Sequence, residues 1–589
     1  MAGHRSPFHF SPRPNRAHEI HWHEWNDATF RLAQAEDKPV FLDLTAVWCH
    51  WCHVLDEITL SDLEVIRALN ERYIPVRVDN DRRPDINERY NQGGWPTTAF
   101  LTPTGELLGG ATYLTPEQMR PLLTRIADYY RENREQIAAE IARLRSSTVS
   151  EATRGQLSKS MVDVVAEAVS KAFEPTFGGF GQQMKFPNPE AVAFALRRHH
   201  LTGDQRMLEI AVRTLDAMAA AGICDQVEGG FFRYSTTPDW SIPHFEKMLE
   251  INAGLLANYA EAYHLTQAEH HRQTAQGIME FLEQVLLDGD RGVFGGSQDA
   301  DEEYFQLAAE QRAQREAPYV DRTVYVSWNA MAASAYLAAY RAIGGEQLLE
   351  LAQRVTEFLL GHCHRPKAGM CRYHDGQPQL FGLLGDQAYM VRALLDLHEA
   401  SGEAYYLNTA EEIAAFVCER LSSERGGFRD RPSEADALGA LRVETRPFIE
   451  NSVMGGNLAR MARLTGKQDY LELARSTLEA FAPDYADYGY FAASYALAVE
   501  RVLQDPVEMV IVGSPLDTRA RELRVGCLRI YEPRRELIQL DPAADAERIA
   551  ERGFPAGDRP TLYVCIGRRC SAPISDPAQI PDALASAPI

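Results

Sequence analysis

The sequence predicts a multidomain fold in which an α/β domain precedes an all-α toroid of the (α/α)6 type and a short α/β segment ends the chain. The chain has 589 residues, enough for two to four domains of usual size. Strand and helix patterns alternate near the start, long amphipathic patterns fill the middle, and strand patterns return near the end. We expect the three parts to span residues 1–150, 151–505 and 506–589.

The first domain is predicted from short alternating elements. Residues 38–49 form an apolar run typical of a strand, residues 63–73 have helical periodicity, and residues 73–79 form a second apolar strand. Residues 97–110 predict a β-hairpin, because Pro and Gly punctuate two strand-like runs. This order indicates a compact α/β domain.

The middle region is predicted to be a ring of helical hairpins. About twelve amphipathic segments lie between residues 158 and 504. A glycine-aromatic turn recurs six times at intervals of about 51 to 77 residues, each long enough for one helical pair. Such a repeat indicates an open solenoid or a closed ring, and six pairs favour the ring. After residue 505, strand-like runs predict the small C-terminal segment.

Charge and composition exclude several classes of function. Lys and Arg number 60 and Asp and Glu 83, which gives a net charge of −23 and disfavours nucleic-acid binding. The sequence has no apolar window of transmembrane length, and its N-terminus lacks the apolar core of a secretion signal. We therefore expect a cytoplasmic protein without a nucleic-acid or membrane partner. No motif indicates a metal or cofactor, so we expect neither, and the sequence leaves the oligomeric state open.

A Cys-x-x-Cys motif follows the first predicted strand, at the start of a helix. Free N–H groups at a helix start stabilise a thiolate, so we expect Cys49 to be an exposed nucleophile and Cys52 the resolving thiol. A protonated His50 would add to this effect. The alternative is a zinc site formed by Cys49, His50, Cys52 and His53. Four ligands so close together in the sequence cannot easily surround one ion.

Two further positions agree with a redox role. Asp43 lies six residues before Cys49 on the strand, where a buried carboxylate of raised pKa can take the proton of the resolving thiol. Pro96 follows Trp95 just before the hairpin strand, where a cis-proline beside the thiols would contact a substrate backbone. The alternative is an ordinary trans proline in a turn. Together these residues predict a thioredoxin-like domain with a redox-active disulfide.

Long segments of the chain resemble one family. They are WCHWCHVL, RVDNDRRPDI, GGWPTTAFLTPTG, KFPNP, GGFFRYSTTPDWSIPHFEKML, GGSQDADEE and YVCIGRRCSAP. They are similar to the thioredoxin-domain proteins that include the spermatogenesis-associated thioredoxin-like protein. The resemblance covers nearly the whole chain. It implies a thioredoxin-like domain followed by a six-hairpin (α/α)6 region similar to N-acylglucosamine 2-epimerases and six-hairpin glycosidases.

Polar and aromatic residues recur shortly after the glycine-aromatic turns, at the starts of predicted inner helices. Loops at one end of a helical ring form a cup, and helix starts there point toward a ligand. The candidates for proton transfer are His244, Glu246, Asp299, Asp301, Asp386 and Glu450. The candidates for substrate binding are Trp95, Lys185, Phe231, Tyr234, Trp240, Lys247, Trp328, Asn329 and Asn451.

This inventory fits two reactions on a carbohydrate. Glycoside hydrolysis needs two carboxyl groups, whereas epimerisation next to a carbonyl uses paired histidines or other bases. The alternative is that these residues only cap helices. We predict a thiol-disulfide oxidoreductase domain fused to a barrel that binds a carbohydrate or a thiol-containing protein. The alternatives are a barrel that is itself an epimerase or glycosidase, and a non-catalytic scaffold.

A second cysteine pair, Cys565 and Cys570, lies at the end of a predicted strand with Arg568 and Arg569 between them. Neighbouring arginines lower the pKa of a thiol. If the tail folds back on the first domain, this pair could be a redox relay for Cys49. Alternatively, Cys565 is a core residue and Cys570 an unpaired loop residue.

Overall fold

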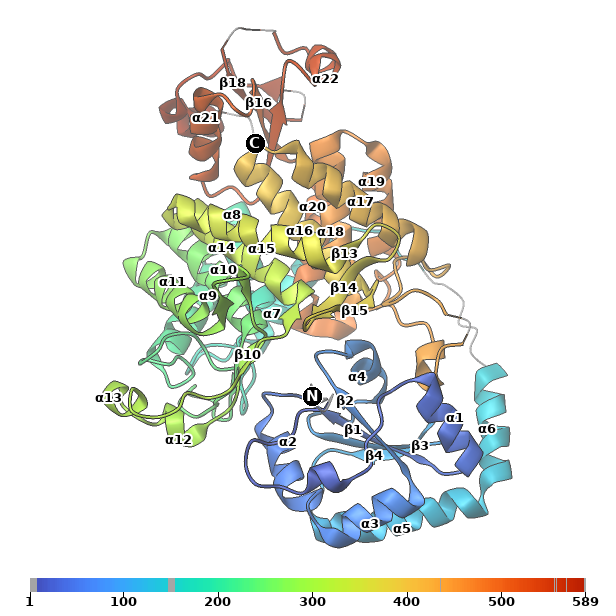
Figure 1. Cartoon of the computed structure of the whole chain (residues 1–589). Coiled ribbons are helices and arrows are strands. Elements are labelled where there is room, and N and C mark those ends of the chain that lie inside the picture. Colours follow the sequence, from blue (N-terminus) through green and yellow to red (C-terminus); the bar gives the residue numbers. More distant parts are fainter. Residues whose placement is uncertain are drawn as a thin grey trace.

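The computed structural model describes residues 8–146, 154–434, 436–555, 557, 559–567 and 569–586. An α/β domain, a ring of helices and a small α/β segment follow one another, with the two α/β parts at opposite ends of the ring (Figure 1). The predicted fold class is thereby confirmed. The expected boundary between residues 150 and 151 lies outside the described residues.

The N-terminal domain is built on a four-stranded sheet of order β2-β1-β3-β4. The strands are β1 (Val40–Thr45), β2 (Ile74–Asp79), β3 (Thr97–Leu101) and β4 (Leu107–Ala111). β1 runs parallel to β2 and antiparallel to β3, and β3 runs antiparallel to β4. The central strands β1 and β3 are buried along their whole length, which is why both read as apolar runs.

Helices flank this sheet. They are α1 (Asp27–Glu36), α2 (His50–Val54), the π-helical turn η2 (Leu55–Thr59), α3 (Leu63–Arg72), α4 (Pro84–Tyr90), α5 (Pro116–Glu132) and α6 (Arg134–Ser146). Local signals fix several of their ends. Asp62 caps α3 by accepting hydrogen bonds from the backbone of residues 64 and 65, and α4 begins with Pro84, a residue favoured in the first helical turn.

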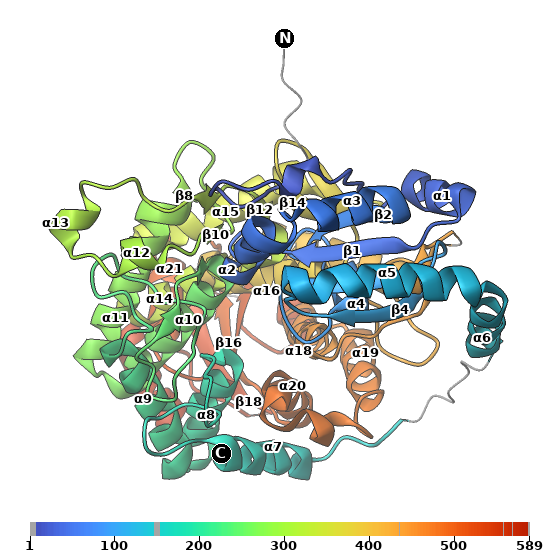
Figure 2. The same ribbon diagram turned by 90° about the horizontal axis from the view of Figure 1, so that it is seen from below.

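Twelve of the described helices form six hairpins that close into a ring (Figure 2). The inner helices are α8 (Pro189–Thr202), α10 (Leu249–Thr266), α14 (Val326–Ile343), α16 (Leu384–Ser401), α18 (Phe448–Thr465) and α20 (Ala493–Leu503). The outer helices are α9 (Gln205–Ala220), α11 (Glu269–Phe281), α15 (Glu346–Cys363), α17 (Ala404–Arg420), α19 (Gln468–Glu479) and α7 (Lys159–Ala172). Each inner helix contacts the next and α20 returns to α8, so the solenoid alternative is wrong.

Short strands and helices join the hairpins. They are β5 (Tyr234–Ser235), β6 (Pro243–His244), β7 (Lys247–Met248), β8 (Leu287–Asp288), β9 (Val293–Phe294), β10 (Ser297–Gln298), α12 (Glu302–Phe305), α13 (Ala309–Arg312), β11 (Val320–Asp321), β12 (Val324–Tyr325), β13 (His364–Arg365), β14 (Gly369–His374) and β15 (Pro378–Phe381). β7 pairs with β10, which pairs with β11. The connections that carry β10, β14 and β15 lie toward the N-terminal domain (Figure 1).

The glycine-aromatic repeat has a structural cause. In four hairpins, an amide side chain in the first turn of the inner helix accepts a hydrogen bond from a backbone N–H of the preceding turn. The pairs and N···O distances are Asn252 with Phe231 (2.7 Å), Asn329 with Phe294 (2.9 Å), Gln387 with Met370 (2.7 Å) and Asn451 with Phe428 (2.7 Å). Each amide also donates to the carbonyl of the same turn residue. Asn329 and Asn451 therefore hold turns, and their predicted role in substrate binding is wrong.

The C-terminal segment forms a second four-stranded sheet, of order β17-β16-β18-β19. Its strands are β16 (Val507–Val512), β17 (Arg535–Leu540), β18 (Thr561–Ile566) and β19 (Arg569–Cys570), and its helices are α21 (Thr518–Leu528), α22 (Ala546–Glu551) and α23 (Ile580–Ser586). Throughout the described residues, no helix has both the length and the apolar character needed to cross a lipid bilayer.

Candidate functional site

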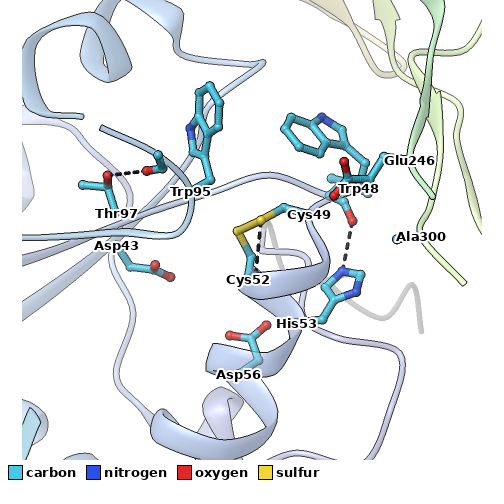
Figure 3. Close-up of a disulfide and its surroundings, with 12 residues drawn as sticks. Asp43, Trp48, Cys49, Cys52, His53, Asp56, Trp95, Thr97, Glu246 and Ala300 are labelled. Carbon is cyan, nitrogen blue, oxygen red and sulfur yellow. Dashed lines mark hydrogen bonds between the residues drawn. A yellow bond between two sulfur atoms is a disulfide. The ribbon is translucent and has the colours of Figure 1, made fainter. Parts of the chain in front are cut away.

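The first site is the disulfide between Cys49 and Cys52, where β1 gives way to α2 (Figure 3). Cys49 caps α2, and its sulfur accepts a hydrogen bond from the backbone N–H of Cys52 at 3.2 Å. The peptide bond between Trp95 and Pro96 is cis, and Trp95 lies beside the disulfide. The structure therefore places Trp95, the residue before the cis-proline, beside the two cysteines that the sequence singled out.

Both cysteines are sealed inside the molecule. Cys49 is 4% exposed and Cys52 is 1% exposed, and both belong to the apolar core of the helical ring. The expectation of an exposed Cys49 is therefore wrong for this oxidised form. The reason is that the ring packs its connecting loops onto the face of the N-terminal domain that holds the disulfide.

Residues of the ring form the cover over the disulfide. The guanidinium of Arg233 lies over the ring of Trp48, 4.4 Å from its centroid, and pairs with Glu246 at 3.2 Å. The imidazole of His244 stacks on Tyr234, with centroids 4.8 Å apart. Asp299 lies 3.8 Å from the His53 ring nitrogen. His244, Glu246 and Asp299, which the sequence assigned to the barrel cup, thus lie at the thiol pair.

Burial shifts the pKa values of the side chains that cover the disulfide. Burial raises the pKa of Asp299 to about 8 and also raises the pKa of Glu246. Burial lowers the pKa of His53 to about 4, and it lowers the pKa of His50 and His244 below the ordinary value. In this oxidised form burial therefore favours the neutral imidazoles, against the expectation of a protonated His50 beside Cys49.

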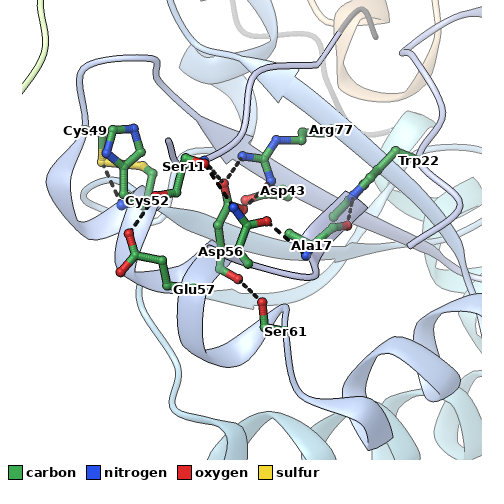
Figure 4. A network of polar contacts seen from close by, with 12 residues as sticks. Ser11, Ala17, Trp22, Asp43, Cys49, Cys52, Asp56, Glu57, Ser61 and Arg77 are labelled. Carbon is green, nitrogen blue, oxygen red and sulfur yellow. Dashed lines mark hydrogen bonds and ion pairs between the residues drawn. A yellow bond between two sulfur atoms is a disulfide. The ribbon is translucent and has the colours of Figure 1, made fainter. Parts of the chain in front are cut away.

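A buried charge network lies beneath the disulfide (Figure 4). Arg77 Nη1 is 2.8 Å from Asp43 Oδ2 and 2.8 Å from Asp56 Oδ1, and both carboxylates are 1% exposed. Phe10 covers the guanidinium at 4.7 Å, and the backbone N–H of Ser11 donates to Asp56 at 3.0 Å. The N-terminal extension therefore seals this network from water.

Asp43 has the properties of a proton acceptor. Burial raises its pKa to about 6, although the neighbouring Arg77 opposes the shift. Its Oδ2 pairs with Arg77, whereas its Oδ1 is buried without a hydrogen-bond partner. The carboxyl group is directed toward Cys52 (Figure 3). Asp43 can therefore hold or release a proton near neutral pH beside the resolving thiol.

The second site is a cavity of about 670 Å³ at the end of the ring that faces the N-terminal domain. Trp328, Asp386 and Glu450 line it, as the sequence predicted for a cup. Among the described residues, eight carboxyl groups and one guanidinium line the cavity: Asp81, Asp85, Glu88, Glu190, Glu250, Asp386, Asp430, Glu450 and Arg372. Of these acids, only Asp386 and Glu450 were predicted from the sequence, and Asp81, Asp85 and Glu88 belong to the N-terminal domain.

Burial shapes the acidity of the cavity walls. It raises the pKa of Asp386 to about 6, with Arg372 at 3.3 Å opposing the shift. It raises the pKa of Asp81 to about 8. Asp81 also accepts a hydrogen bond of 2.6 Å from the indole N–H of Trp48, the residue before Cys49. One hydrogen bond thus joins the cavity wall to the thiol motif.

Several residues predicted to act on a substrate have structural roles instead. Lys185 and Lys247 are fully buried and pair with Glu174 at 2.8 Å and with Asp225 at 2.6 Å. Phe231 and Trp240 are fully buried core residues. Asp301 caps α12 by accepting a hydrogen bond from the backbone of Tyr304.

Cys565 and Cys570 form a disulfide that joins β18 to β19. This segment lies at the opposite end of the ring from the N-terminal domain (Figure 1). The expectation of a direct relay to Cys49 is therefore wrong in this arrangement, because the whole ring separates the two disulfides. Arg568, which was expected to tune these thiols, lies outside the described residues.

One group of side chains could hold a metal ion, among the residues that the structure describes. Asp216 of α9 meets His270 and His271 of α11, and their ligand atoms lie within 4.8 Å of one another. Both imidazoles already contact the same oxygen of Asp216, at 2.9 and 3.0 Å. The group lies on the outer helices, and none of its members lines the cavity.

Comparison with known proteins agrees with this two-part design. Residues 3–148 match the Thioredox_DsbH family model, described as a protein of unknown function (DUF255), and residues 246–430 match the N-acylglucosamine 2-epimerase family model. The chain is homologous to spermatogenesis-associated protein 20 of Homo sapiens, at 26% identity over 95% of this chain and 89% of that protein.

Two further similarities cover one part of the chain each. The thiol:disulfide interchange protein DsbD of Campylobacter jejuni is 37% identical over 71 residues, which are 12% of this chain and 12% of that protein. The structure of a cellobiose 2-epimerase from Spirochaeta thermophila covers 59% of this chain and 95% of its own, with a TM-score of 0.49 and 14% identity.

Proposed function

Starting from a chain that joins a DsbH-type thioredoxin-like domain to an epimerase-like helical ring, we propose that it is a cytoplasmic thiol-disulfide oxidoreductase. One observation carries the proposal: the Cys49–Cys52 disulfide caps α2 directly above the buried carboxyl group of Asp43. The similarity to a thiol:disulfide interchange protein supports the same chemistry.

The reaction transfers two electrons from the dithiol to a substrate disulfide. The Cys49 thiolate attacks one sulfur of the substrate, forms a mixed disulfide and releases the first substrate thiolate. Asp43 then takes the proton of the Cys52 thiol. The Cys52 thiolate attacks the Cys49 sulfur, releases the second substrate thiolate and closes the Cys49–Cys52 disulfide. The same steps in reverse oxidise a substrate dithiol.

Burial of the disulfide favours a small substrate over a folded protein. Cys49 is 4% exposed and Arg233 of the ring covers the neighbouring Trp48, so a protein disulfide cannot reach its sulfur in this arrangement. A low-molecular-weight disulfide needs a much smaller opening. We therefore propose small thiol compounds as the partners of this site, ahead of the thiol-containing protein expected from the sequence.

The test compares a small and a large disulfide substrate. The reduced protein should reduce oxidised glutathione at least about tenfold faster, per disulfide, than it reduces insulin. Cys49→Ser should abolish the exchange, and Cys52→Ser should accumulate a glutathione adduct on Cys49, which mass spectrometry detects. Asp43→Asn should slow the second step because the resolving thiol loses its proton acceptor. A Cys49→Ser variant that exchanges thiols at the normal rate would refute the proposal.

A second candidate function belongs to the ring, and the 670 Å³ cavity favours it. Asp386 and Glu450 line the cavity with Trp328, and burial raises the pKa of both acids. No histidine is among the described residues that line it, which disfavours epimerisation by paired histidines. We propose that the ring acts on a carbohydrate through carboxyl groups, as an acid and base pair.

The test for this second function is a turnover assay on a panel of oligosaccharides. Glu450→Gln and Asp386→Asn should each abolish turnover while leaving the melting temperature within a few degrees. Asp301→Asn is the matched control, because Asp301 caps a short helix outside the cavity. Equal loss in the control variant, or turnover unaffected by both cavity variants, would contradict the assignment.

A further inference from the structure

The cavity between the ring and the N-terminal domain is lined by eight carboxyl groups and one guanidinium among the described residues. Four of its eight carboxyl groups have partners. Asp85 pairs with Arg83 at 2.8 Å, Asp430 with Arg89 at 2.7 Å, and Asp386 with Arg372 at 3.3 Å. The fourth, Asp81, accepts the indole N–H of Trp48.

The other four carboxyl groups form no ion pair in the part of the chain that the structure describes. They are Glu88, Glu190, Glu250 and Glu450. Glu190, Glu250 and Glu450 lie in the first turns of three inner helices, α8, α10 and α18, whereas Glu88 comes from α4 of the N-terminal domain. Elements from both domains thus direct unpaired acids into one space.

Helix capping does not account for these acids. A carboxylate in a first helical turn is stabilised by the helix dipole, which lowers its pKa. Here the balance is opposite: burial raises the pKa of Glu250 to about 7, and Glu190 and Glu450 raise it further by repulsion. The pKa of Glu450 is raised as well. Arg372, the one guanidinium among the described residues that line the cavity, lowers the pKa of both glutamates but does not offset the effect of their burial.

An independent observation marks the place of a hydrogen-bond donor. Asp386 is 1% exposed and lines the cavity, yet its Oδ2 has no hydrogen-bond partner. Buried acceptors in proteins are nearly always satisfied. A protonated amine brings three N–H donors together with a positive charge, so it would satisfy this oxygen and neutralise the neighbouring glutamates.

The remaining walls suit an organic cation of the size of a sugar. Trp328, Tyr389 and Tyr490 line the cavity, and aromatic faces attract cations and stack on polyol chains. The volume of about 670 Å³ is typical of a small-molecule site. We propose that this cavity binds a small polyhydroxylated amine in its protonated form, held by Glu250, Glu450 and Asp386. This inference deepens the proposed function of the ring and does not depend on the cysteine pair.

The experiment uses three ligands that share one open-chain polyol body and differ in charge: N-methylglucamine (positive), sorbitol (neutral) and gluconate (negative). Binding to the full chain is measured by calorimetry at pH 7.5 and about 0.15 M salt, which screens the general attraction of an acidic protein for cations. We expect N-methylglucamine to bind at least about tenfold more tightly than sorbitol. Gluconate should not bind.

Charge-neutral variants test the position of the site. Glu250→Gln combined with Glu450→Gln should lower the affinity for N-methylglucamine to that for sorbitol. Glu500→Gln is the matched control and should keep the tenfold preference, because Glu500 is also a buried glutamate of raised pKa in the ring but does not line the cavity.

The outcomes separate this inference from the wider proposal. Equal binding of sorbitol and N-methylglucamine would overturn the cation site while leaving a polyol site in the ring. Tighter binding of gluconate, no binding of any ligand, or an unchanged preference in the double variant would also overturn it. If the double variant does not fold, as judged by its melting curve, the charge series on the unmodified protein decides alone.

Discussion

Sheets with the same strand order lie at the two ends of the helical ring, yet they hold their disulfides in different places. The orders are β2-β1-β3-β4 and β17-β16-β18-β19, and in both the first pair is parallel and the other pairs are antiparallel. A proline precedes the third strand in each, Pro96 and Pro560. The N-terminal disulfide follows the first strand at a helix start, whereas the C-terminal one links the third and fourth strands.

The two sheets also differ at one matched position of their first strands. The fourth residue of β1 is Asp43, which pairs in register with Arg77, whereas the fourth residue of β16 is Val510, which pairs with Ile538. A sheet with this strand order therefore forms with an apolar pair at this position. The buried ion pair in the N-terminal sheet is not needed to build the sheet, and it lies beneath the cysteines of the proposed thiol exchange.

The largest expected effect comes from removing the cation of the N-terminal sheet. Arg77→Leu leaves Asp43 and Asp56 buried without a countercharge, so the free energy of unfolding at pH 7 should fall by about 3 to 5 kcal/mol. The loss should be smaller at pH 5, because the Asp43 carboxyl group, whose pKa burial raises to about 6, can then take up a proton. Urea denaturation at both pH values measures this.

The matched position in the C-terminal sheet gives the control. Ile538→Val removes one buried methyl group and should lower the free energy of unfolding by about 1 kcal/mol, independent of pH. If Arg77→Leu costs no more than this, or costs the same at pH 5 and pH 7, the network around Arg77 does not hold ionised carboxylates.

The second prediction concerns the C-terminal disulfide. Its cysteines have a sequence separation of 5. A disulfide that closes a loop of this length stabilises the folded state by about 2 kcal/mol. Cys570→Ser should therefore cost about 2 kcal/mol under oxidising conditions. It should leave the rate of glutathione exchange at Cys49 unchanged, because the two disulfides lie at opposite ends of the ring (Figure 1). A slowed exchange would restore the relay that the sequence suggested.

The sequence was sufficient to predict the architecture because its signals are local and periodic. The run at residues 38–49, the Cys-x-x-Cys motif and the six recurring turns each indicate an element without reference to the others. The buried position of Asp43 near the cysteines could also be inferred, since a lone acid in an apolar strand needs a reason. By the same argument, the lone arginine at position 77 of the second apolar strand signals a buried ion pair.

The sequence could not predict which site each loop residue would join. Asp299 and Asp386 occupy similar places after their turns, but one lies at the disulfide and the other in the cavity. The packing of the N-terminal domain on the ring decides this, and it depends on contacts between residues hundreds of positions apart. The burial of Cys49 has the same cause. Aligning the repeats on the clamping amides would not have found Glu250, because it lies two residues before Asn252, whereas Asp386 and Glu450 lie one residue before theirs.

The third and smallest prediction compares the two mouths of the ring. The mouth next to the C-terminal sheet includes ion pairs such as that of Arg197 with Glu261 at 2.8 Å. The mouth next to the N-terminal domain holds unpaired glutamates such as Glu250. Replacing a carboxylate with glutamine should therefore have opposite consequences at the two mouths.

At the N-terminal mouth, Glu250 binds a proton more tightly in the folded protein than in the unfolded chain, because burial raises its pKa from 4.5 to about 7. The unfolded chain then loses this proton at a lower pH, so the contribution of Glu250 to stability falls as pH rises from about 5 to 8. Between pH 5 and pH 8, the free energy of unfolding of the unmodified protein should therefore fall by about 1 to 2 kcal/mol more than that of Glu250→Gln.

Glu261→Gln, which leaves Arg197 unpaired, should instead make the protein less stable than the unmodified chain at pH 8. Thermal unfolding of the three proteins at pH 5 and pH 8 measures both differences, and parallel curves for the two variants would mean that the charges of the two mouths are balanced alike.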